Sequence, residues 1–142
     1  MTAQVGILGA TGAVGQRFIQ LLDGHPTFET AALTASESSA GHPYREAAKW
    51  RADSPIPDDI AEMEVGKTDP DHVGDDIDLL FSSLPSGVAN KVEAAFLEAG
   101  YVVSSNSSND RMADDVPLTN PEINPDHLNM IAVQPDNPGR GR

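Results

Sequence analysis

The most constraining feature of this sequence is a glycine-rich turn that separates a short apolar run from an amphipathic segment near the start of the chain. Residues 5–8 are apolar apart from one glycine, as in a strand that is buried on both faces. Gly9, Gly12 and Gly15 follow directly. Beyond them, apolar residues recur with the period of a helix as far as residues 23–26, where Gly and Pro end the pattern. A strand, a tight turn and a helix in this order predict a βα unit.

The rest of the chain continues the alternation of strands and helices. An amphipathic pattern over residues 88–99, followed by Gly100 at the position of a C-terminal cap, predicts a second long helix. A weak helical pattern covers residues 44–51, and residues 69–78 form an acidic connector. Further strands are expected at residues 28–33, 63–65, 77–81 and 101–103.

Strands that alternate with helices at this spacing pair in parallel through right-handed crossovers. We therefore predict an α/β fold with a doubly wound, mostly parallel sheet, the class of the Rossmann-type dinucleotide-binding domains. In such sheets ligands bind beyond the carboxyl ends of the strands. We expect the site along one edge, in the polar and glycine-rich loops that follow Leu8, Leu33, Phe81 and Val103.

The charge balance limits the partners. The 142 residues contain 22 Asp and Glu against 9 Lys and Arg, a formal net charge of −13, which argues against a nucleic-acid surface. No apolar run approaches the ~18 residues of a membrane span, and the first residues lack the basic region of a signal peptide. We therefore expect a soluble cytoplasmic protein. The acidic composition suits a halophile, because salt screens like charges, and an ordinary acidic protein is the alternative.

The glycine turn is a candidate binding site for a dinucleotide. Glycines at this GxxGxxG spacing let the backbone approach a pyrophosphate, whose charge is met by free N–H groups and the positive end of the helix dipole. The alternative is a turn that only packs the helix on the strand. No Gly-Lys-Ser/Thr follows, which excludes a P-loop ATPase. The candidate cofactor-binding residues of this turn are Gly9, Thr11, Gly12, Ala13, Val14 and Gly15.

The residues after the second strand bear on the choice between NADP and NAD. Ser36, Ser38 and Ser39 suit the 2′-phosphate of NADP. Glu37 suits the free 2′-hydroxyl of NAD and would repel a phosphate. This loop alone leaves both coenzymes open, and a serine loop that is merely solvated is a third interpretation.

A polar cluster over residues 104–111 follows the last expected strand and ends in Arg111. A charge-assisted hydrogen bond contributes ~1.5–3 kcal/mol, so Arg111 could anchor an anionic group of a substrate. The alternative is a surface ion pair between Arg111 and Asp114 or Asp115. The chain contains no cysteine and its four histidines share no metal-ligand spacing, so we expect neither a metal site nor a cysteine nucleophile.

Several blocks of the sequence, in their order and spacing, resemble the aspartate-semialdehyde dehydrogenases, specifically their archaeal and fungal-type branch. Each block is weak alone, but together they cover the chain from residue 5 to about residue 133. The blocks are residues 9–18 (GATGAVGQRF), 33–41 (LTASESSAG), 82–86 (SSLPS), 103–106 (VSSN) with 111–112 (RM), 116–118 (VPL) and 121–128 (PEINPDHL).

The resemblance implies an NADP-dependent oxidoreductase that reductively dephosphorylates aspartyl phosphate to aspartate semialdehyde, in the biosynthesis of lysine, threonine and methionine. It implies that the glycine turn holds the coenzyme pyrophosphate and that the loop from Ser36 to Ser39 holds the adenosine 2′-phosphate. It also implies that Asn106 and Arg111 bind the phosphate of the substrate, and that full-length relatives are homo-oligomers. The residues near the nicotinamide would be Ser83, Leu84, Pro85 and Ser86.

The sequence departs from this family in two respects. Glu37 and His42 stand where relatives often carry basic residues for the 2′-phosphate, so NAD stays a possible coenzyme. The cysteine block of the family, and its second domain with a catalytic histidine and most of the dimer interface, do not follow. We therefore expect an NAD(P)-binding domain at residues 1–133, a disordered Pro/Gly-rich tail at 134–142 and no catalytic residue. Truncation or a frameshift would leave this chain inactive alone.

Two alternatives stay open. A relative of N-acetyl-γ-glutamyl-phosphate reductase would share the fold and the chemistry, and would differ mainly in the second domain. A noncatalytic dinucleotide-binding fragment, or a gene remnant, would bind the coenzyme weakly and expose the apolar face that a second domain covers.

Overall fold

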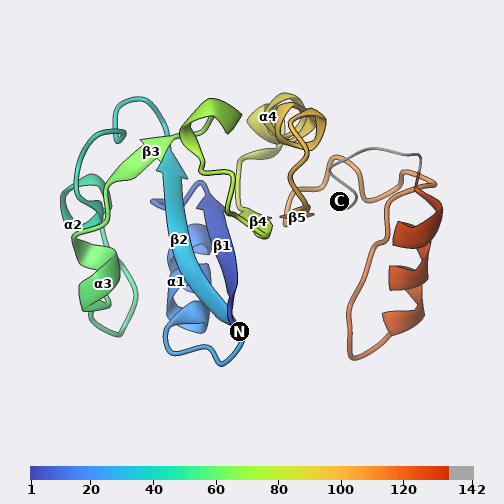
Figure 1. Ribbon diagram of the computed structural model, residues 1–142, viewed down its shortest axis with the longest axis horizontal. Helices are drawn as coiled ribbons and strands as arrows, with labels where there is room; N and C mark the ends of the chain where they lie inside the picture. Colours follow the sequence, from blue (N-terminus) through green and yellow to red (C-terminus); the bar gives the residue numbers. More distant parts are fainter. Residues whose placement is uncertain (135–142) are drawn as a thin grey trace.

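Five strands form one sheet in which all neighbouring strands are parallel, in the order β3-β2-β1-β4-β5 (Figure 1). This computed structural model describes residues 1–134. The central strand β1 pairs with β2 on one side and with β4 on the other, and four of its six residues are buried. The strands are β1 (Ala3–Leu8), β2 (Phe28–Ala35), β3 (Val65–Lys67), β4 (Leu79–Ser82) and β5 (Val103–Ser105).

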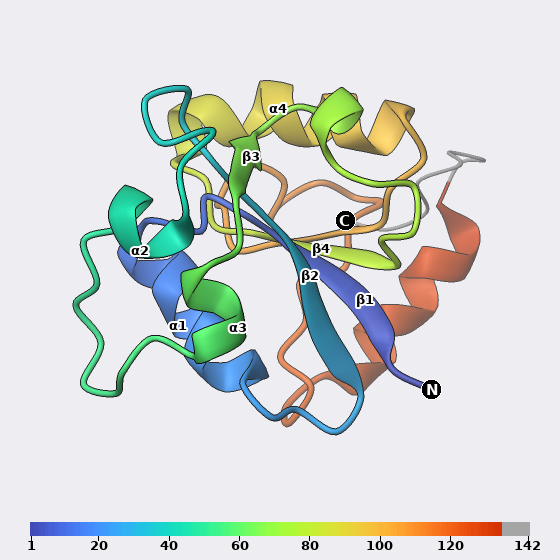
Figure 2. The ribbon, with the colours of Figure 1, turned by 60° about the vertical axis from the view of Figure 1, so that its left-hand side comes forward.

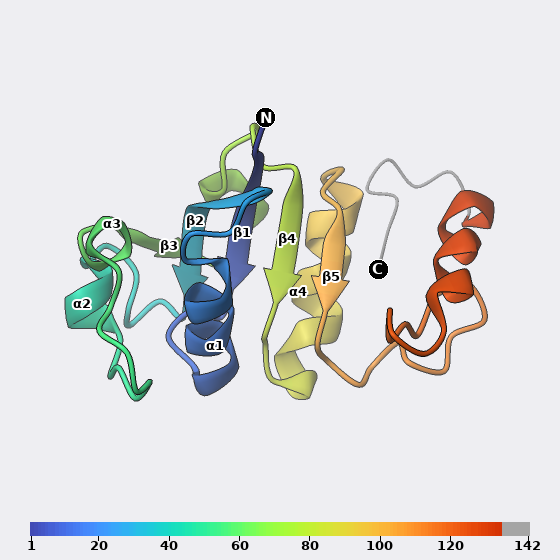
Figure 3. The same ribbon diagram turned by 90° about the horizontal axis from the view of Figure 1, so that it is seen from below.

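Helices cover both faces of the sheet, as the turned views show (Figures 2 and 3). Helix α1 lies on one face with the short helices α2 and α3, and α4 lies on the other face. This arrangement confirms the predicted doubly wound α/β class. The helices are α1 (Ala13–Leu22), α2 (Tyr44–Ala47), α3 (Asp58–Ala61) and α4 (Ser86–Glu98), with 3-10 helices η1 (Pro70–His72) and η2 (Pro125–Val133).

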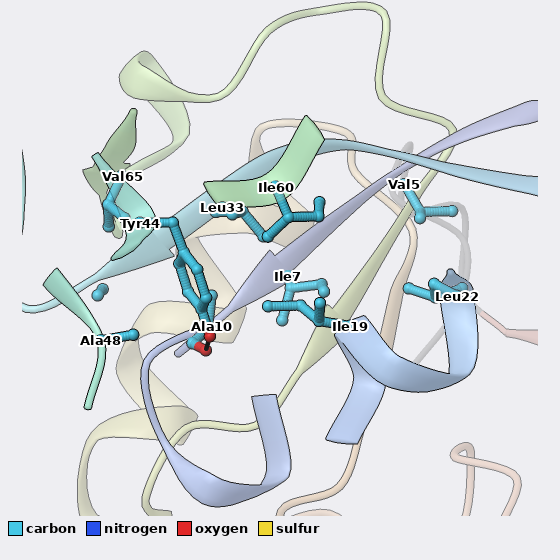
Figure 4. Close-up of a cluster of buried hydrophobic side chains, with 11 residues drawn as sticks. Val5, Ile7, Ala10, Ile19, Leu22, Leu33, Tyr44, Ala48, Ile60 and Val65 are labelled. Carbon is cyan, nitrogen blue, oxygen red and sulfur yellow. Dashed lines mark hydrogen bonds between the residues drawn. The ribbon is translucent and has the colours of Figure 1, made fainter. Parts of the chain in front are cut away.

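Each face of the sheet has its own apolar core, because the side chains of β1 alternate between the two faces. Val5 and Ile7 belong to the core under α1, α2 and α3, where Tyr44 is also buried (Figure 4). Leu8 belongs to the core under α4, together with Leu80 of β4 and further apolar residues. Leu8, the last residue of β1, is paired with Thr34 of β2 and with Ser82 of β4, so these three strands end close together at the edge where the site lies.

The element boundaries differ from the sequence-based expectation at several places. The expected helix at residues 44–51 is one turn, because Lys49 and Arg51 are tied by their backbone to the side chain of Gln16. The expected strand at 63–65 lies at Val65–Lys67, because Glu64 pairs with Pro43 in an antiparallel bridge instead of with β2. Strands β2 and β5 each run two residues beyond the expected end, to Ala35 and Ser105.

The C-terminal part of the described chain lies beyond β5 and packs little against the sheet (Figure 3). No residue of η2 is buried. Of the Pro/Gly-rich tail expected at 134–142, residues 135–142 lie outside the described residues. Within residues 1–134, no helix has the length and apolar character needed to cross a membrane. The large apolar side chains exposed between the end of β5 and residue 134 are Met112, Leu118, Ile123, Leu128, Ile131 and Val133.

Candidate functional site

A cleft of about 510 Å³ lies at the carboxyl ends of β1, β2, β3 and β4. The ends of parallel strands meet at one edge of a doubly wound sheet, and ligands bind there, outside the strand ends. The edge predicted from the sequence is therefore the edge that carries the cleft. Its lining residues are Gly9, Thr11, Gly12, Ala35, Ser36, Glu37, Lys67, Thr68, Asp69, Ser83, Leu84, Pro85, Val88 and Val92.

The glycine turn between β1 and α1 requires glycine for two different reasons. Gly9 has a φ of +78°, in the left-handed region that favours glycine. At Gly15 the constraint is space, because an added Cβ would lie 2.3 Å from the carbonyl oxygen of Gly9. The backbone N–H groups of Gly9 and Ala10 both donate to the carbonyl of Thr34, at 3.0 and 2.9 Å. The turn is thereby held against the end of β2.

Helix α1 begins beside the cleft with no side-chain cap. The first N–H groups of a helix have no partner within the helix, and the dipole places partial positive charge at this end. Gly12, Ala13 and Val14 are exposed there, and Gly12 lines the cleft. The start of α1 therefore fits an anion such as a pyrophosphate. Ala13, Val14 and Gly15 do not line the cleft themselves, so they would reach the anion only through the backbone N–H groups of the first helical turn.

Two buried side chains, neither of them predicted as a site residue, hold the glycine turn from behind. The Gln16 amide donates to the carbonyls of Thr11 and Lys49, both at 3.0 Å, and its oxygen accepts from the N–H of Arg51 at 2.8 Å. The Tyr44 hydroxyl donates to the carbonyl of Ala10 at 2.8 Å, and burial raises the pKa of Tyr44 well above its usual range. Apart from the bond between Gln16 and Thr11, these bonds join residues 33 to 35 positions apart, so only a prediction of long-range contacts could have found them.

The loop after β2 brings part of the predicted serine cluster to the cleft. Ser36 and Glu37 line it, whereas Ser38 and Ser39 do not. The hydroxyls of Ser36 and Ser38 lie 3.0 Å apart, within hydrogen-bond distance. The N–H of Ser39 donates to the carbonyl of Ser36 at 2.9 Å, which turns the loop back on itself. Ser38 therefore contacts Ser36, which lines the cleft, without lining the cleft itself.

The end of β3 and the residues after it also line the cleft, and they were not predicted from the sequence. Lys67, the last residue of β3, and the following Thr68 and Asp69 line the cleft next to the loop after β2. The Thr68 hydroxyl lies 3.0 Å from both the Thr34 hydroxyl and the carbonyl of Ala35, so it fastens the end of β3 to β2. The rule that ligands bind beyond the carboxyl ends of parallel strands would have found them if it had been applied to β3 as well as to the other four strands.

The loop after β4 closes the other side of the cleft with Ser83, Leu84 and Pro85, while Ser86 does not line it. The Ser83 hydroxyl lies 2.9 Å from the carbonyl of Leu8 and 3.0 Å from that of Gly9. This hydroxyl therefore joins the ends of β1 and β4. Ser83 lines the cleft, but its hydroxyl and its N–H are both bonded to the backbone at the end of β1 and the turn.

A buried carboxylate joins the ends of β4 and β5. Glu93 of α4 is 1% exposed and accepts a hydrogen bond from the Ser82 hydroxyl and another from the Ser105 hydroxyl, both at 2.6 Å. Such short O–H···O distances are typical of a hydroxyl that donates to a carboxylate. Glu93 thereby fixes the start of the loop that carries Asn106 and Arg111.

Asn106 and Arg111 lie together, outside the cleft described above. The Arg111 guanidinium donates to the backbone carbonyl of Asn106 at 3.2 Å, and both residues are exposed. Arg111 also borders a separate pocket of about 70 Å³ with Ser105 and Ser107. Neither of the salt bridges among residues 1–134 involves Arg111, so the alternative pair with Asp114 or Asp115 is not formed.

This arrangement of strand ends, glycine turn and uncapped helix has known counterparts. The protein family described as "Semialdehyde dehydrogenase, NAD binding domain" matches residues 4–131, nearly the whole described chain. The chain belongs to this family. The semialdehyde dehydrogenase match includes all five strands except the first residue of β1, and every residue predicted for the site.

Individual relatives agree with the family match. Over 130 residues the chain is 57% identical to an aspartate-semialdehyde dehydrogenase from Methanothermobacter thermautotrophicus, covering 92% of this chain and 37% of that protein. It is 41% identical over 133 residues to a malonyl CoA reductase (NADP) from Metallosphaera sedula, covering 94% of this chain and 37% of the relative. A crystal structure of aspartate semialdehyde dehydrogenase with NADP from Candida albicans superposes with a TM-score of 0.88 at 43% identity, covering 92% and 37% of the two chains. The chain thus spans a little over a third of the length of these semialdehyde dehydrogenase relatives.

Proposed function

We propose that this chain is the coenzyme-binding part of an NADP-dependent aspartate-semialdehyde dehydrogenase. The observation that carries the proposal is the cleft itself: a glycine turn, packed so closely at Gly15 that no side chain fits there, leads into an uncapped helix start at the edge where parallel strands end. These features fit the pyrophosphate of a dinucleotide. The reaction we assign to the whole enzyme is the reductive dephosphorylation of aspartyl phosphate to aspartate semialdehyde, for the synthesis of lysine, threonine and methionine.

Each side of the cleft has a role in this proposal. The pyrophosphate would lie on the glycine turn and the start of α1, from Gly9 to Gly15. The adenosine 2′-phosphate would lie near Ser36, with Ser38 and Ser39 behind it. The NADP in the Candida albicans relative supports this coenzyme, and NAD remains the alternative because Glu37 lines the same region. The nicotinamide end would lie near the loop formed by Ser83, Leu84, Pro85 and Ser86.

For the substrate, we propose that Asn106 and Arg111 hold the phosphate group. Both residues are exposed and adjacent, and Arg111 has no carboxylate partner among residues 1–134, which supports a role in binding an external anion. They lie on the loop after β5, on the same side of β1 as the expected nicotinamide position. Glu93 would keep that loop in place through Ser105.

The coenzyme, when bound, supplies a hydride. The residues of this chain would bind and orient it, while the acyl group of such reactions is carried on a thiol. These 142 residues contain no cysteine. We therefore propose that residues 1–133 act as an NAD(P)-binding domain and that the 142-residue polypeptide binds coenzyme without reducing acyl phosphates by itself.

A second candidate function is the reduction of malonyl-CoA. The malonyl CoA reductase of Metallosphaera sedula is as similar to this chain as an aspartate-semialdehyde dehydrogenase of Saccharomyces cerevisiae, since both are 41% identical. The proposed coenzyme-binding part is therefore shared by proteins whose names imply different acyl substrates. The 57% identity to an archaeal aspartate-semialdehyde dehydrogenase favours the first assignment.

The net charge of −13 leads us to propose a salt-rich host. A negatively charged protein repels a polyanionic coenzyme, and at 1 M salt the Debye length falls to ~3 Å, which removes the long-range part of this repulsion. Coenzyme affinity that rises between 0.1 and 1 M KCl supports the idea, and affinity that falls steadily over this range contradicts it.

The proposed function is tested by titrating NADPH into the 142-residue protein and following its fluorescence. We expect saturable binding, and a loss of about tenfold or more in Gly12→Ala, because the methyl group would lie where the pyrophosphate approaches several N–H donors. The fold should tolerate this change, since the new Cβ would meet only the Gly9 carbonyl oxygen, at 3.6 Å. Thermal unfolding of the variant checks that point. A wild-type protein that binds neither NADPH nor NADH would refute the proposal.

A further inference from the structure

We propose that Lys67, at the end of β3, is the residue that selects NADP over NAD, by binding the adenosine 2′-phosphate. The inference rests on the proposed function, because it concerns one group of the coenzyme in the same cleft. The loop after β2 contains both Ser36, which suits a phosphate, and Glu37, which repels one, so a cation from the neighbouring strand β3 would decide between the two coenzymes.

The register of the sheet places Lys67 beside the adenosine side of the cleft. Lys67 is paired with Ala35, and paired residues of parallel strands point to the same face. Ala35 and Lys67 both line the cleft, next to Ser36. The Thr68 hydroxyl, 3.0 Å from the Ala35 carbonyl, prevents the two strand ends from separating. The position of Lys67 relative to Ser36 is therefore set by backbone pairing and by a side-chain bond.

The charges of the cleft-lining side chains also point to Lys67 as the partner of an anion. Among the cleft-lining residues given above, Lys67 alone carries a positive charge, whereas Glu37 and Asp69 are acidic. Asp69 is engaged elsewhere, since its carboxylate accepts from the N–H of Asp71 at 2.9 Å and lies 3.8 Å from the His72 imidazole. Neither salt bridge found in residues 1–134 includes Lys67. The ammonium group is thus exposed, unpaired and directed to the cleft.

The balance between Lys67 and Glu37 explains how the cleft could accept a phosphate. Without a cation, the Glu37 carboxylate would repel a 2′-phosphate and accept from a 2′-hydroxyl. With Lys67 in the same cleft, the phosphate gains a charge-assisted hydrogen bond from the ammonium and a second hydrogen bond from the Ser36 hydroxyl. NAD carries only a neutral hydroxyl at the 2′ position, so it gains no ion pair with the ammonium there. The pairing of β2 with β3 therefore sets the coenzyme preference.

The test compares two small probes that differ in one phosphate, adenosine 2′,5′-bisphosphate and adenosine 5′-monophosphate, by calorimetric titration of the full chain. In Lys67→Gln we expect the bisphosphate to bind about tenfold or more weakly while the monophosphate binds as before, because one charge-assisted hydrogen bond is lost. Lys67→Arg should retain most of the affinity. Lys91→Gln is the matched control, since Lys91 is an exposed lysine of α4 that does not line the cleft.

Each outcome is decisive. If the wild-type protein binds neither probe nor NADPH, the proposed function fails and this inference fails with it. If the wild-type protein binds NADPH but Lys67→Gln leaves the ratio between the two probes unchanged, the function stands and the role of Lys67 is refuted. An equal loss for both probes also refutes it, because that result would assign Lys67 to the shared part of the molecule.

Discussion

Replacing Gly15 by alanine is the most direct test of the packing between the glycine turn and α1. The added Cβ would lie 2.3 Å from the Gly9 carbonyl oxygen and 2.7 Å from the Cα of Ala10. Ordinary contacts require about 3.5 Å or more, so the helix start must move away from the turn by about 1 Å. The neighbouring atoms are backbone, and no rotation of a side chain can relieve the contact. Overpacking of this kind costs ~1–3 kcal/mol.

Gly87→Ala is the matched control, because Gly87 also lies in the first turn of a helix, α4, and an added Cβ there meets nothing within 4 Å. Alanine in a helix is more favourable than glycine by up to ~1 kcal/mol. We therefore expect Gly87→Ala to raise the free energy of unfolding and Gly15→Ala to lower it by about 1–3 kcal/mol. The midpoint of thermal unfolding should fall by roughly 3–10 °C in Gly15→Ala.

The measurement is urea and thermal unfolding of both variants and the wild-type protein, followed by circular dichroism at 222 nm. Gly15→Ala should also bind NADPH more weakly, since the displaced helix start no longer presents its N–H groups at the same place. If Gly15→Ala is as stable as Gly87→Ala, the close approach of α1 to the turn does not exist in solution and the reasoning about the turn is wrong.

Two further predictions concern buried polar groups. Tyr44→Phe removes the bond to the Ala10 carbonyl and should lower the free energy of unfolding by ~0.5–1.5 kcal/mol near neutral pH. Because the pKa of Tyr44 is raised in the folded state, the stabilisation by its hydroxyl is complete below pH ~10 and is lost at higher pH. Urea unfolding from pH 8 to 11.5 should therefore show the free energies of unfolding of the two proteins converging, and a constant difference would contradict this. Glu93→Ala leaves the buried Ser82 hydroxyl without its acceptor and should lower the free energy of unfolding by ~1–3 kcal/mol. Glu98→Ala, at an exposed position of the same helix, should change the free energy of unfolding little. Equal effects of the two variants in urea unfolding would disprove the role of Glu93.

The fold was predictable because its signals are local. The apolar runs that became β1 and β4 and the periodic segments that became α1 and α4 are dense enough to be read from neighbours in the sequence. The glycine turn was predictable for the same reason, and the capping position of Gly100 is confirmed by its φ of +98°. Strand β3 was misplaced, because three residues, Val65–Lys67, carry too short a pattern to fix a boundary.

The parts of the site that escaped prediction depend on contacts between distant segments. Lys67 enters the cleft only because β3 pairs with β2, and nothing near it in the sequence marks it as a site residue. Tyr44 bonds to the turn across 34 residues, and Gln16 connects the turn to the segment after α2 across 33 and 35 residues. Ser83 was expected near the nicotinamide from its family block, but its hydroxyl bonds to the backbone of β1. Composition and spacing give no information about such orientation.

The hydrogen bonds that join neighbouring strand ends have a kinetic consequence. Thr68 links β3 to β2, the Thr34 carbonyl links β2 to the turn after β1, Ser83 links β1 to β4, and Glu93 links β4 to β5. The linked strand ends, which form the floor of the cleft, therefore already have their final shape before a ligand arrives. A dinucleotide would meet no slow rearrangement of this surface, so its association should follow a single phase whose rate is proportional to concentration. Differences in affinity among variants of the floor should then appear in the rate at which the coenzyme leaves.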